Sequence, residues 1–310
     1  MSAAIEGLPS VETLRARLVD RNAPLLSRMR TLFSLRNVPG KDSIDALAAA
    51  LDDPSALLKH EIAYAMGQMQ DTYAIPILTR VLSDTEEDAM VRHEAAEALG
   101  AIGDPQCLEL LRKHADNDCR EVRETCELSL DRIAWKKAAG EGAEDLTEKR
   151  FRSVDPAPPV ELEGLSEEEK VTKLRAILMD QSERLFQRYR AMFALRDLNT
   201  DASALAIADA LFDPSALLCH EVAFVLGQMQ RPCTEEALAK ALSDPSLNKM
   251  VRHEAAEALG SVSPSPTAIS LLRQYLAEEK DDVVRDSCAI ALDIADYVQS
   301  GDFQYADVKA

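Results

Sequence analysis

The sequence predicts an all-helical protein in which repeated helical hairpins stack into a solenoid. Long segments recur at an offset of 160 residues, so the chain consists of two matched halves. Within each half, similar segments return every 31–33 residues, and their apolar residues follow the helical period without the alternation that is typical of strands. Units of this length bury their apolar stripes against neighbouring units, which is the organisation of an α-solenoid.

The duplication is visible in two pairs of segments. DPSALLKHEIAYAMGQMQ at 53–70 returns as DPSALLCHEVAFVLGQMQ at 213–230. MVRHEAAEALG at 90–100 returns unchanged at 250–260. We therefore read the two halves as products of one duplication.

Each repeat reads as a helical hairpin. AIPILTRVLSD at 74–84 predicts an amphipathic helix, TEEDA at 85–89 a turn, and the following MVRHEAAEALG a second helix with Gly100 near its end. Asp53 is expected to cap the preceding helix, with Pro54 at its first position. When the flanking units are counted, we expect about eight helical hairpins in two pseudo-symmetric halves. The predicted fold class is therefore an all-α, HEAT-like α-solenoid.

The repeats also divide the chain into segments. Residues 136–169 mix charge, glycine and proline without apolar periodicity, which predicts an exposed linker. We expect an N-terminal HEAT-like repeat half at 1–135, this linker at 136–169, a C-terminal HEAT-like repeat half at 170–300 and a tail at 301–310.

Composition restricts the possible environments and partners. With 46% hydrophobic and 29% charged residues, the chain can bury a substantial core, and no apolar run approaches the ~20 residues that span a bilayer. The opening residues lack the regions of a signal peptide, so we expect a cytoplasmic protein, with the nucleus as a second location, and no membrane partner. The net charge of -19 argues against nucleic acid and favours a cationic partner.

The cysteines lack C-x-x-C spacing, so we expect buried thiols in a reducing compartment. These are Cys107, Cys119, Cys126, Cys219, Cys233 and Cys288.

The histidines carry the strongest chemical signal. Four of the five stand at the same position of the second helix in the two inner hairpins of each half, and each is followed by glutamate. The four pairs are His60-Glu61, His93-Glu94, His220-Glu221 and His253-Glu254. Only His114 falls outside this register; near a helix end, it is expected to be solvated or to complement the helix dipole.

Imidazoles and carboxylates in this register predict a metal site. Packed helices lie roughly 8–10 Å apart, so equivalent side chains of consecutive hairpins can converge on one ion. Two histidines and one carboxylate suit non-haem ferrous iron and leave coordination positions open. If the two halves face each other about a pseudo-twofold axis, their two sets would hold two metals about 3.5–4 Å apart.

Adjacent helical residues diverge by about 100°, so a histidine and the next glutamate cannot both point along one axis. We therefore favour Glu94 and Glu254 as ligands, and Glu61 and Glu221 as the pair that binds a cationic substrate. A bridging role for the latter pair is the alternative, in which all eight residues bind metal.

The pairs HEIAYAMGQMQ/HEVAFVLGQMQ and RHEAAEALG/RHEAAEALG, with their 33-residue spacing and the central linker, closely resemble the deoxyhypusine hydroxylase family from about residue 22 to 298. The resemblance implies a non-haem di-iron monooxygenase with two Fe(2+) per chain that uses O2 and an external reductant. The implied substrate is the deoxyhypusine side chain, an aminobutyl-extended lysine on a basic loop of a translation factor precursor, which is hydroxylated to hypusine.

Two other functions are compatible with the pattern. Helical solenoids commonly serve as non-enzymatic scaffolds that bind partners along one surface, although a scaffold does not explain the histidine register. A binuclear metallohydrolase with zinc or manganese would use a similar ligand set. Metal analysis and an optical spectrum distinguish all three.

Overall fold

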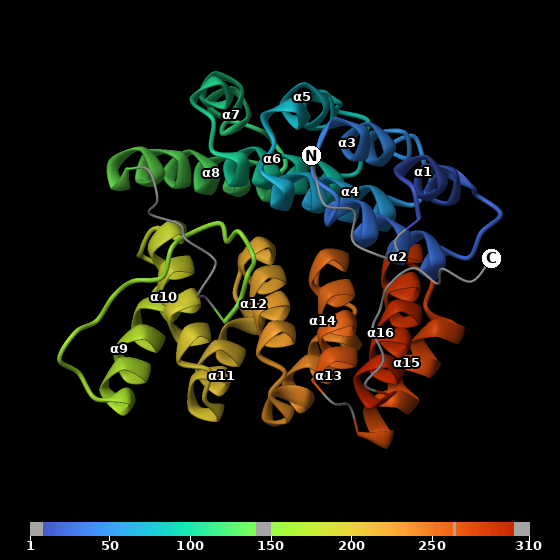
Figure 1. Ribbon diagram of the computed structural model, residues 1–310. Coiled ribbons are helices and arrows are strands. Elements are labelled where there is room, and N and C mark those ends of the chain that lie inside the picture. Colours follow the sequence, from blue (N-terminus) through green and yellow to red (C-terminus); the bar gives the residue numbers. More distant parts are fainter. Residues whose placement is uncertain (1–8, 141–149, 263–264, 301–310) are drawn as a thin grey trace. The chain divides into compact units, whose positions relative to one another are not determined.

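In the computed structural model, which describes residues 9–140, 150–262 and 265–300, the chain forms two compact units. Unit 1 denotes residues 9–140, and unit 2 denotes the described residues between 150 and 300. Within each unit, helical hairpins stack so that their first helices form one row and their second helices another (Figure 1). The predicted all-α solenoid of hairpins is confirmed, because the described residues contain helices and no strand.

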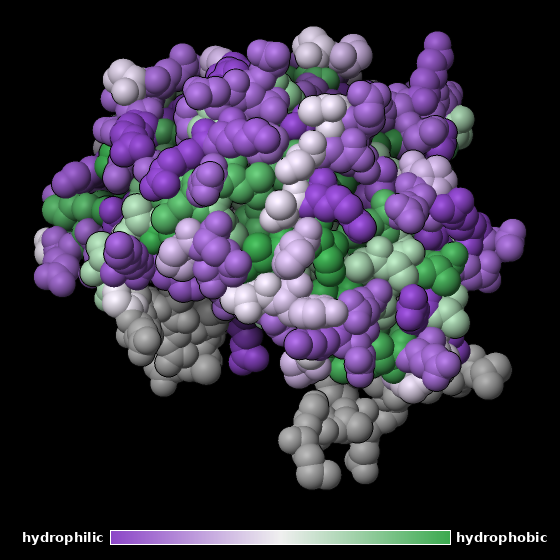
Figure 2. All heavy atoms as spheres, turned by 90° about the horizontal axis from the view of Figure 1, so that it is seen from above, coloured by the Kyte–Doolittle hydropathy of each residue, from purple (hydrophilic) through white to green (hydrophobic). Residues whose placement is uncertain are grey.

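Unit 1 contains four hairpins. Its outer row consists of α1 (Val11–Val19), α3 (Lys41–Ala48), α5 (Ile75–Ser83) and α7 (Leu108–His114). Its inner row consists of α2 (Leu25–Arg36), α4 (Ala56–Met69), α6 (Ala89–Ile102) and α8 (Arg120–Ala139). Seen from the outer row, the surface is largely hydrophilic, with apolar side chains visible between the polar ones (Figure 2).

Unit 2 repeats this plan. Its outer row consists of α9 (Glu167–Met179), α11 (Asp201–Ala208), α13 (Glu235–Ser243) and α15 (Pro266–Glu278). Its inner row consists of α10 (Leu185–Leu198), α12 (Ala216–Met229), α14 (Lys249–Ser261) and α16 (Asp282–Ser300). Short 3-10 turns precede several of the helices. None of the described helices is long and apolar enough to cross a membrane.

The inner helix α4 begins at a serine cap, so the expectation that Asp53 caps it and Pro54 opens it was wrong. The Ser55 hydroxyl accepts a hydrogen bond from the backbone N–H of Leu58 at 3.2 Å, and α4 starts at Ala56. Asp53 accepts instead from the N–H of Ser55, at 2.9 Å. An Asp-Pro-Ser sequence offers two capping side chains, and the second of them lies closer to the first free N–H groups of the helix.

Asp53 has a second role, which is to connect consecutive hairpins. The buried guanidinium of Arg28 on α2 donates to the Asp53 carboxylate at 2.6 Å, and its Nε donates to the carbonyl of Leu18 at the end of α1, at 2.8 Å. In unit 2, the guanidinium of Arg188 on α10 pairs with Asp213, and its Nε donates to the carbonyl of Leu178 at the end of α9. Because buried, hydrogen-bonded ion pairs hold a defined geometry, these contacts tie the starts of α4 and α12 to the preceding hairpins.

Glycines allow the inner helices to approach closely. A Cβ added at Gly67 of α4 would lie 2.8 Å from the Cα of Ala98 on α6, and one added at Gly100 would lie 2.5 Å from the Ser129 hydroxyl on α8. Gly100 therefore lies inside α6 and packs against its neighbour. Gly103, with φ of +74°, ends the helix.

Residues 141–149 lie outside the described residues, and the rest of the segment at 136–169 is only in part the exposed linker that we expected. Its first residues continue α8 to Ala139, and residues 154–157 are buried. Asp155 pairs with the buried guanidinium of Arg196 on α10 at 2.7 Å, and that guanidinium also lies over the Phe151 ring. Sequence periodicity did not detect this burial, because the buried part is only four residues long and combines the apolar Val154 and Ala157 with the polar pair of Asp155. The boundaries of the two halves stay predictions.

The apolar packing between inner helices predicts a large stability effect at Leu259. This side chain is fully buried on α14. We expect Leu259→Ala to lower the free energy of unfolding by about 2–5 kcal/mol, because it removes buried methyl groups and leaves a cavity. Urea unfolding followed by circular dichroism measures this change. Leu205→Ala is the control, because Leu205 on the outer helix α11 is 48% exposed and should change stability little.

Candidate metal centre

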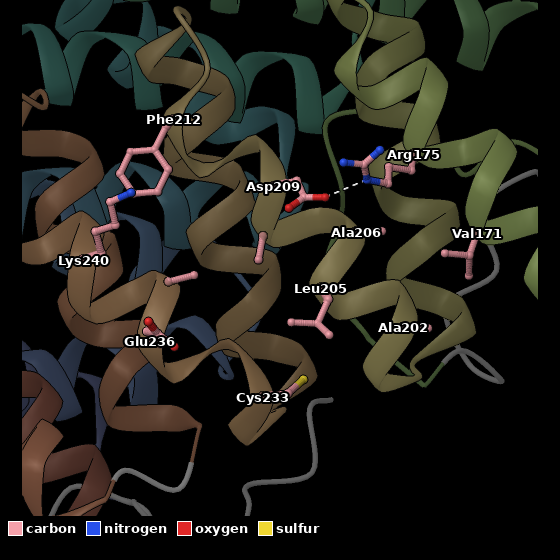
Figure 3. Close-up of a pocket in the computed structure, with 12 residues that line it drawn as sticks. Val171, Arg175, Ala202, Leu205, Ala206, Asp209, Phe212, Cys233, Glu236 and Lys240 are labelled. Atoms are coloured by element: carbon pink, nitrogen blue, oxygen red, sulfur yellow. Dashed lines mark hydrogen bonds and ion pairs between the residues drawn. The ribbon is translucent and has the colours of Figure 1, made fainter.

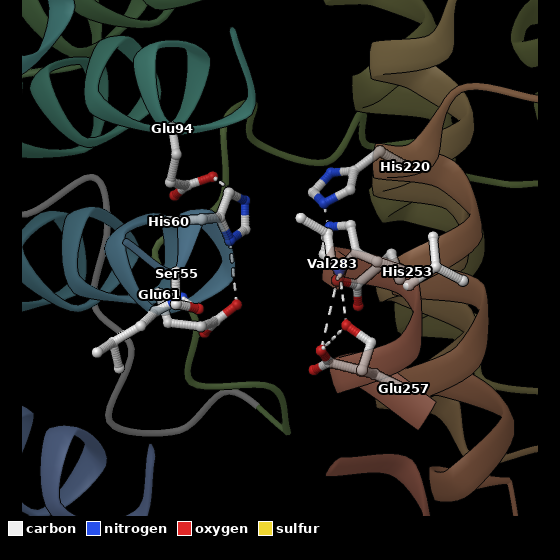
Figure 4. Close-up of polar contacts among 12 residues, drawn as sticks. Ser55, His60, Glu61, Glu94, His220, His253, Glu257 and Val283 are labelled. Atoms are coloured by element: carbon white, nitrogen blue, oxygen red, sulfur yellow. Dashed lines mark hydrogen bonds and ion pairs between the residues drawn. The ribbon is translucent and has the colours of Figure 1, made fainter. Parts of the chain in front are cut away.

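In unit 1 the inner helices α4 and α6 bring their histidine and glutamate pairs together. His60 Nε2 lies 3.2 Å from an oxygen of Glu94 on the neighbouring helix, and His60 Nδ1 lies 3.1 Å from an oxygen of Glu61 (Figure 4). The His60 and His93 ring centroids are 5.5 Å apart. All four side chains are buried. One imidazole is thus flanked by two carboxylates, one at each ring nitrogen.

In unit 2 the helices α12 and α14 form the matching cluster. The His220 and His253 ring centroids are 5.2 Å apart, and His220 Nε2 lies 3.6 Å from an oxygen of Glu254. Each of these three residues offers one ligand atom, and the three atoms lie within 4.8 Å of one another. Glu221 is also buried on α12.

The electrostatics of the unit 1 cluster favour a cation. Burial by itself lowers the pKa of His60, but the charge of Glu94 and hydrogen bonds to Glu61 and Glu94 raise that pKa well above its usual value. Buried carboxylates are costly unless a positive charge compensates them. A metal ion held here would compensate the charge of these carboxylates.

The donor set of unit 2 fits a first-row divalent metal. Ligand atoms that share one ion at about 2.0–2.2 Å must lie within roughly 4.4 Å of one another, and His220 Nε2 lies 3.6 Å from the Glu254 oxygen. Two imidazoles and one carboxylate leave coordination positions open, which is typical of catalytic non-haem iron rather than of closed structural zinc sites.

Two glutamates that we did not single out also lie at these clusters. Glu97 of α6 lies within 4.8 Å of the ligand atoms of His93 and Glu94, and Glu257 of α14 lies 3.8 Å from Nδ1 of His253. Each stands four residues after its histidine, so it shares a helix face with it. That i, i+4 spacing in HEAAE was the available signal.

His114 and two cysteines differ from expectation. His114 ends α7 as predicted, but it is buried, and burial together with the nearby Arg92 and Lys113 lowers its pKa, which disfavours a charged dipole-complementing role.

All six cysteines are free thiols. Cys233 is exposed and Cys119 half-buried, so only the other four are buried as expected. Cys119 and Cys233 lie near helix starts, where apolar periodicity does not determine burial.

A hollow of about 620 Å³ lies elsewhere in unit 2, among the outer helices α9, α11 and α13 (Figure 3). Leu205 and Phe212 line it together with the Arg175–Asp209 ion pair. None of the eight His and Glu residues belongs to its lining. The hollow is therefore separate from the candidate metal centre.

Stacked hairpins with buried His/Glu clusters on their inner helices define a HEAT-repeat protein with metal-binding potential. Residues 44–131 and 202–293 match the family of HEAT repeats, which confirms the predicted repeat type.

The full-length comparisons are more specific. The chain is 49% identical to deoxyhypusine hydroxylase of Drosophila melanogaster over 297 residues, covering 96% of this chain and 95% of the relative. It is 47% identical to the Homo sapiens enzyme over 298 residues, with the same shares. The structure of human deoxyhypusine hydroxylase in complex with glycerol matches with a TM-score of 0.86 and 47% identity, covering 93% of this chain and 96% of that one. This chain belongs to the deoxyhypusine hydroxylase family, a family of hydroxylating enzymes.

Proposed function

We propose that the protein is a deoxyhypusine hydroxylase that uses two Fe(2+) per chain and O2 to hydroxylate the deoxyhypusine side chain of a translation factor precursor. The observation that carries the proposal is the occurrence of the same buried His/Glu cluster on matching inner helices of both units. Membership of the family supports the reaction class. A non-enzymatic scaffold does not explain these ionisable groups, because burying them costs free energy.

The metal would be held by imidazole and carboxylate donors of the inner helices. In unit 1 these are His60, His93 and Glu94, and in unit 2 they are His220, His253 and Glu254. Bound iron would supply the redox chemistry needed to oxidise an aliphatic C–H bond, which has no acidic proton for a general base. The reaction inserts one oxygen atom of O2 into that bond and releases the other as water, so an external reductant must deliver two electrons together with two protons.

The remaining glutamates would bind the substrate's positive charge. Glu61 and Glu221 follow the first histidine of each unit and are buried beside it. An aminobutyl-extended lysine carries ammonium groups, and a desolvated ammonium requires an anionic partner. A carboxylate here would orient the arm so that its reacting carbon faces the metal, an effect of positioning rather than of acid–base chemistry.

The charge of the whole chain supports a basic protein partner. A net charge of -19 produces a negative potential that attracts cationic segments and speeds their encounter. We propose that this partner is the basic loop of the translation factor precursor, and not nucleic acid or a membrane. The reaction would take place in the cytoplasm, with the nucleus as a second location.

Metal analysis with an optical spectrum of the purified protein, followed by an assay on the deoxyhypusine-containing precursor, tests the proposal. We expect about two irons per chain, a visible absorption band from the oxidised iron–oxygen centre, and a substrate mass increased by one oxygen atom. Zinc or manganese with no such band, combined with hydrolytic activity, would favour a metallohydrolase. Protein that takes up no metal and leaves the precursor unchanged would favour a scaffold.

A further inference from the structure

The neighbourhood of His253 contains a hydroxyl and a carboxylate with no role in the function proposed above. Ser287 on α16 is fully buried, and its hydroxyl donates to a carboxylate oxygen of Glu257 on α14 at 2.8 Å. The same hydroxyl oxygen lies 3.5 Å from Nδ1 of His253, and Glu257 lies 3.8 Å from that nitrogen (Figure 4). Two inner helices thus contribute to one chain of polar contacts.

The direction of these contacts determines the protonation pattern of the imidazole. An ionised carboxylate only accepts, so the single hydroxyl proton of Ser287 is directed to Glu257. The hydroxyl oxygen can then only accept from His253, 3.5 Å from Nδ1, which favours the tautomer with the imidazole proton on Nδ1. A neutral imidazole has one N–H, so Nε2 retains the lone pair that a metal requires.

We propose that Ser287 and Glu257 are positioning residues that fix His253 in its Nδ1–H tautomer and orient Nε2 for metal binding. The inference rests on the proposed metal site and adds to it two residues that do not touch the metal. Hydrogen bonds of this kind to the second ring nitrogen also increase the basicity of the ligand.

The corresponding position in unit 1 is different. Thr125 on α8 occupies the place of Ser287, and its hydroxyl donates to the carbonyl of Glu121 in its own helix at 2.8 Å. Glu97 lies close to His93 there, within 4.8 Å between ligand atoms. The hydroxyl contact to Glu257 is therefore a feature of unit 2, and its loss should affect the unit 2 site selectively.

The first measurement uses metal-free, full-length protein with ¹⁵N-labelled imidazoles. We expect His253 to show a protonated Nδ1 and an unprotonated Nε2 in the wild type, and a mixture of tautomers in Ser287→Ala. His253→Ala assigns the signals. This readout needs no metal, so it remains valid even if the protein binds no iron. An Nε2–H tautomer in the wild type, or an unchanged tautomer in Ser287→Ala, contradicts the inference.

The second measurement is metal affinity, by titrating the metal-free protein with Fe(2+) under anaerobic conditions. Ser287→Ala and Glu257→Gln should each weaken binding at one site about 10–100-fold. The first variant removes the hydroxyl, and in the second the amide offers donors as well as an acceptor, so it no longer directs the hydroxyl. Ser287→Thr keeps the hydroxyl and should restore affinity. If wild-type protein binds iron and both variants bind it equally well, the positioning role is refuted; if wild-type protein binds none, the proposed function fails instead.

Ser129→Ala is the matched control. Ser129 is also buried at an inner helix contact, where its hydroxyl donates to the carbonyl of Ala96 at 2.9 Å, and unit 2 has Ala291 at the corresponding place. This variant should unfold earlier in urea but retain its iron affinity. Should Ser129→Ala lose affinity as much as Ser287→Ala, the effect would come from helix packing and the proposal would be wrong.

Discussion

Replacing any one of His60, His93, His220 or His253 by alanine is expected to reduce the iron content from about two per chain to one or fewer and to abolish hydroxylation. Each imidazole lies in a buried cluster with carboxylates from its own or a neighbouring helix. Loss of one nitrogen ligand leaves a buried carboxylate without its metal, so the weakened site does not retain the ion. Iron analysis after desalting, combined with the precursor assay, measures both effects.

The same variants should leave the helices largely intact. The histidines contact polar groups, whereas the apolar contacts between hairpins come from residues such as Leu259. His114→Ala is the matched control, because this histidine is also buried but lies at the end of α7, outside the clusters that could hold a metal. It should keep full iron content and activity. If all four variants retained the iron of the wild type, the assignment of these histidines as ligands would be wrong.

The repeats predicted the fold because a solenoid is determined locally. Each hairpin contains its own turn and apolar stripe, and its neighbours along the chain supply the surface against which it packs. Identical segments such as 90–100 and 250–260 must therefore form the same hairpin twice. The register that placed His60 and His93 on adjacent inner helices follows from the same regularity.

The sequence was less informative where polar contacts decide the structure. Arg196 and Asp155 bury part of the segment after α8, although nothing in its composition distinguishes that part from an exposed linker. Likewise, the sequence does not show that Ser287 of α16 lies beside Glu257. Such contacts join residues of different helices at distances of a few ångströms, and periodicity locates a helix face but not the hydrogen bonds formed on it.

The four glutamates should separate into two pairs when each is replaced by alanine. Glu94→Ala and Glu254→Ala are expected to lose metal, with affinity falling by more than the ~10–100-fold caused by residues that only support a ligand. The reason is the direction of the two carboxylates. An oxygen of Glu94 lies 3.2 Å from Nε2 of His60, and an oxygen of Glu254 lies 3.6 Å from Nε2 of His220, each on the preceding inner helix. A carboxylate and an imidazole nitrogen that face one point can share an ion there.

Glu61→Ala and Glu221→Ala are expected to impair turnover more than iron retention and to lower turnover about a hundredfold, because the substrate's ammonium groups would lose the anion that positions them. Glu61 contacts Nδ1 of His60, on the side of the ring away from Nε2. Iron stoichiometry and affinity for the modified-lysine precursor, measured in all four variants, decide the division. Glu236→Ala, at an exposed position of the outer helix α13, should change neither quantity. Equal iron loss in all four variants would mean that every one of these glutamates binds metal, and the division into ligands and substrate anchors would have to be abandoned.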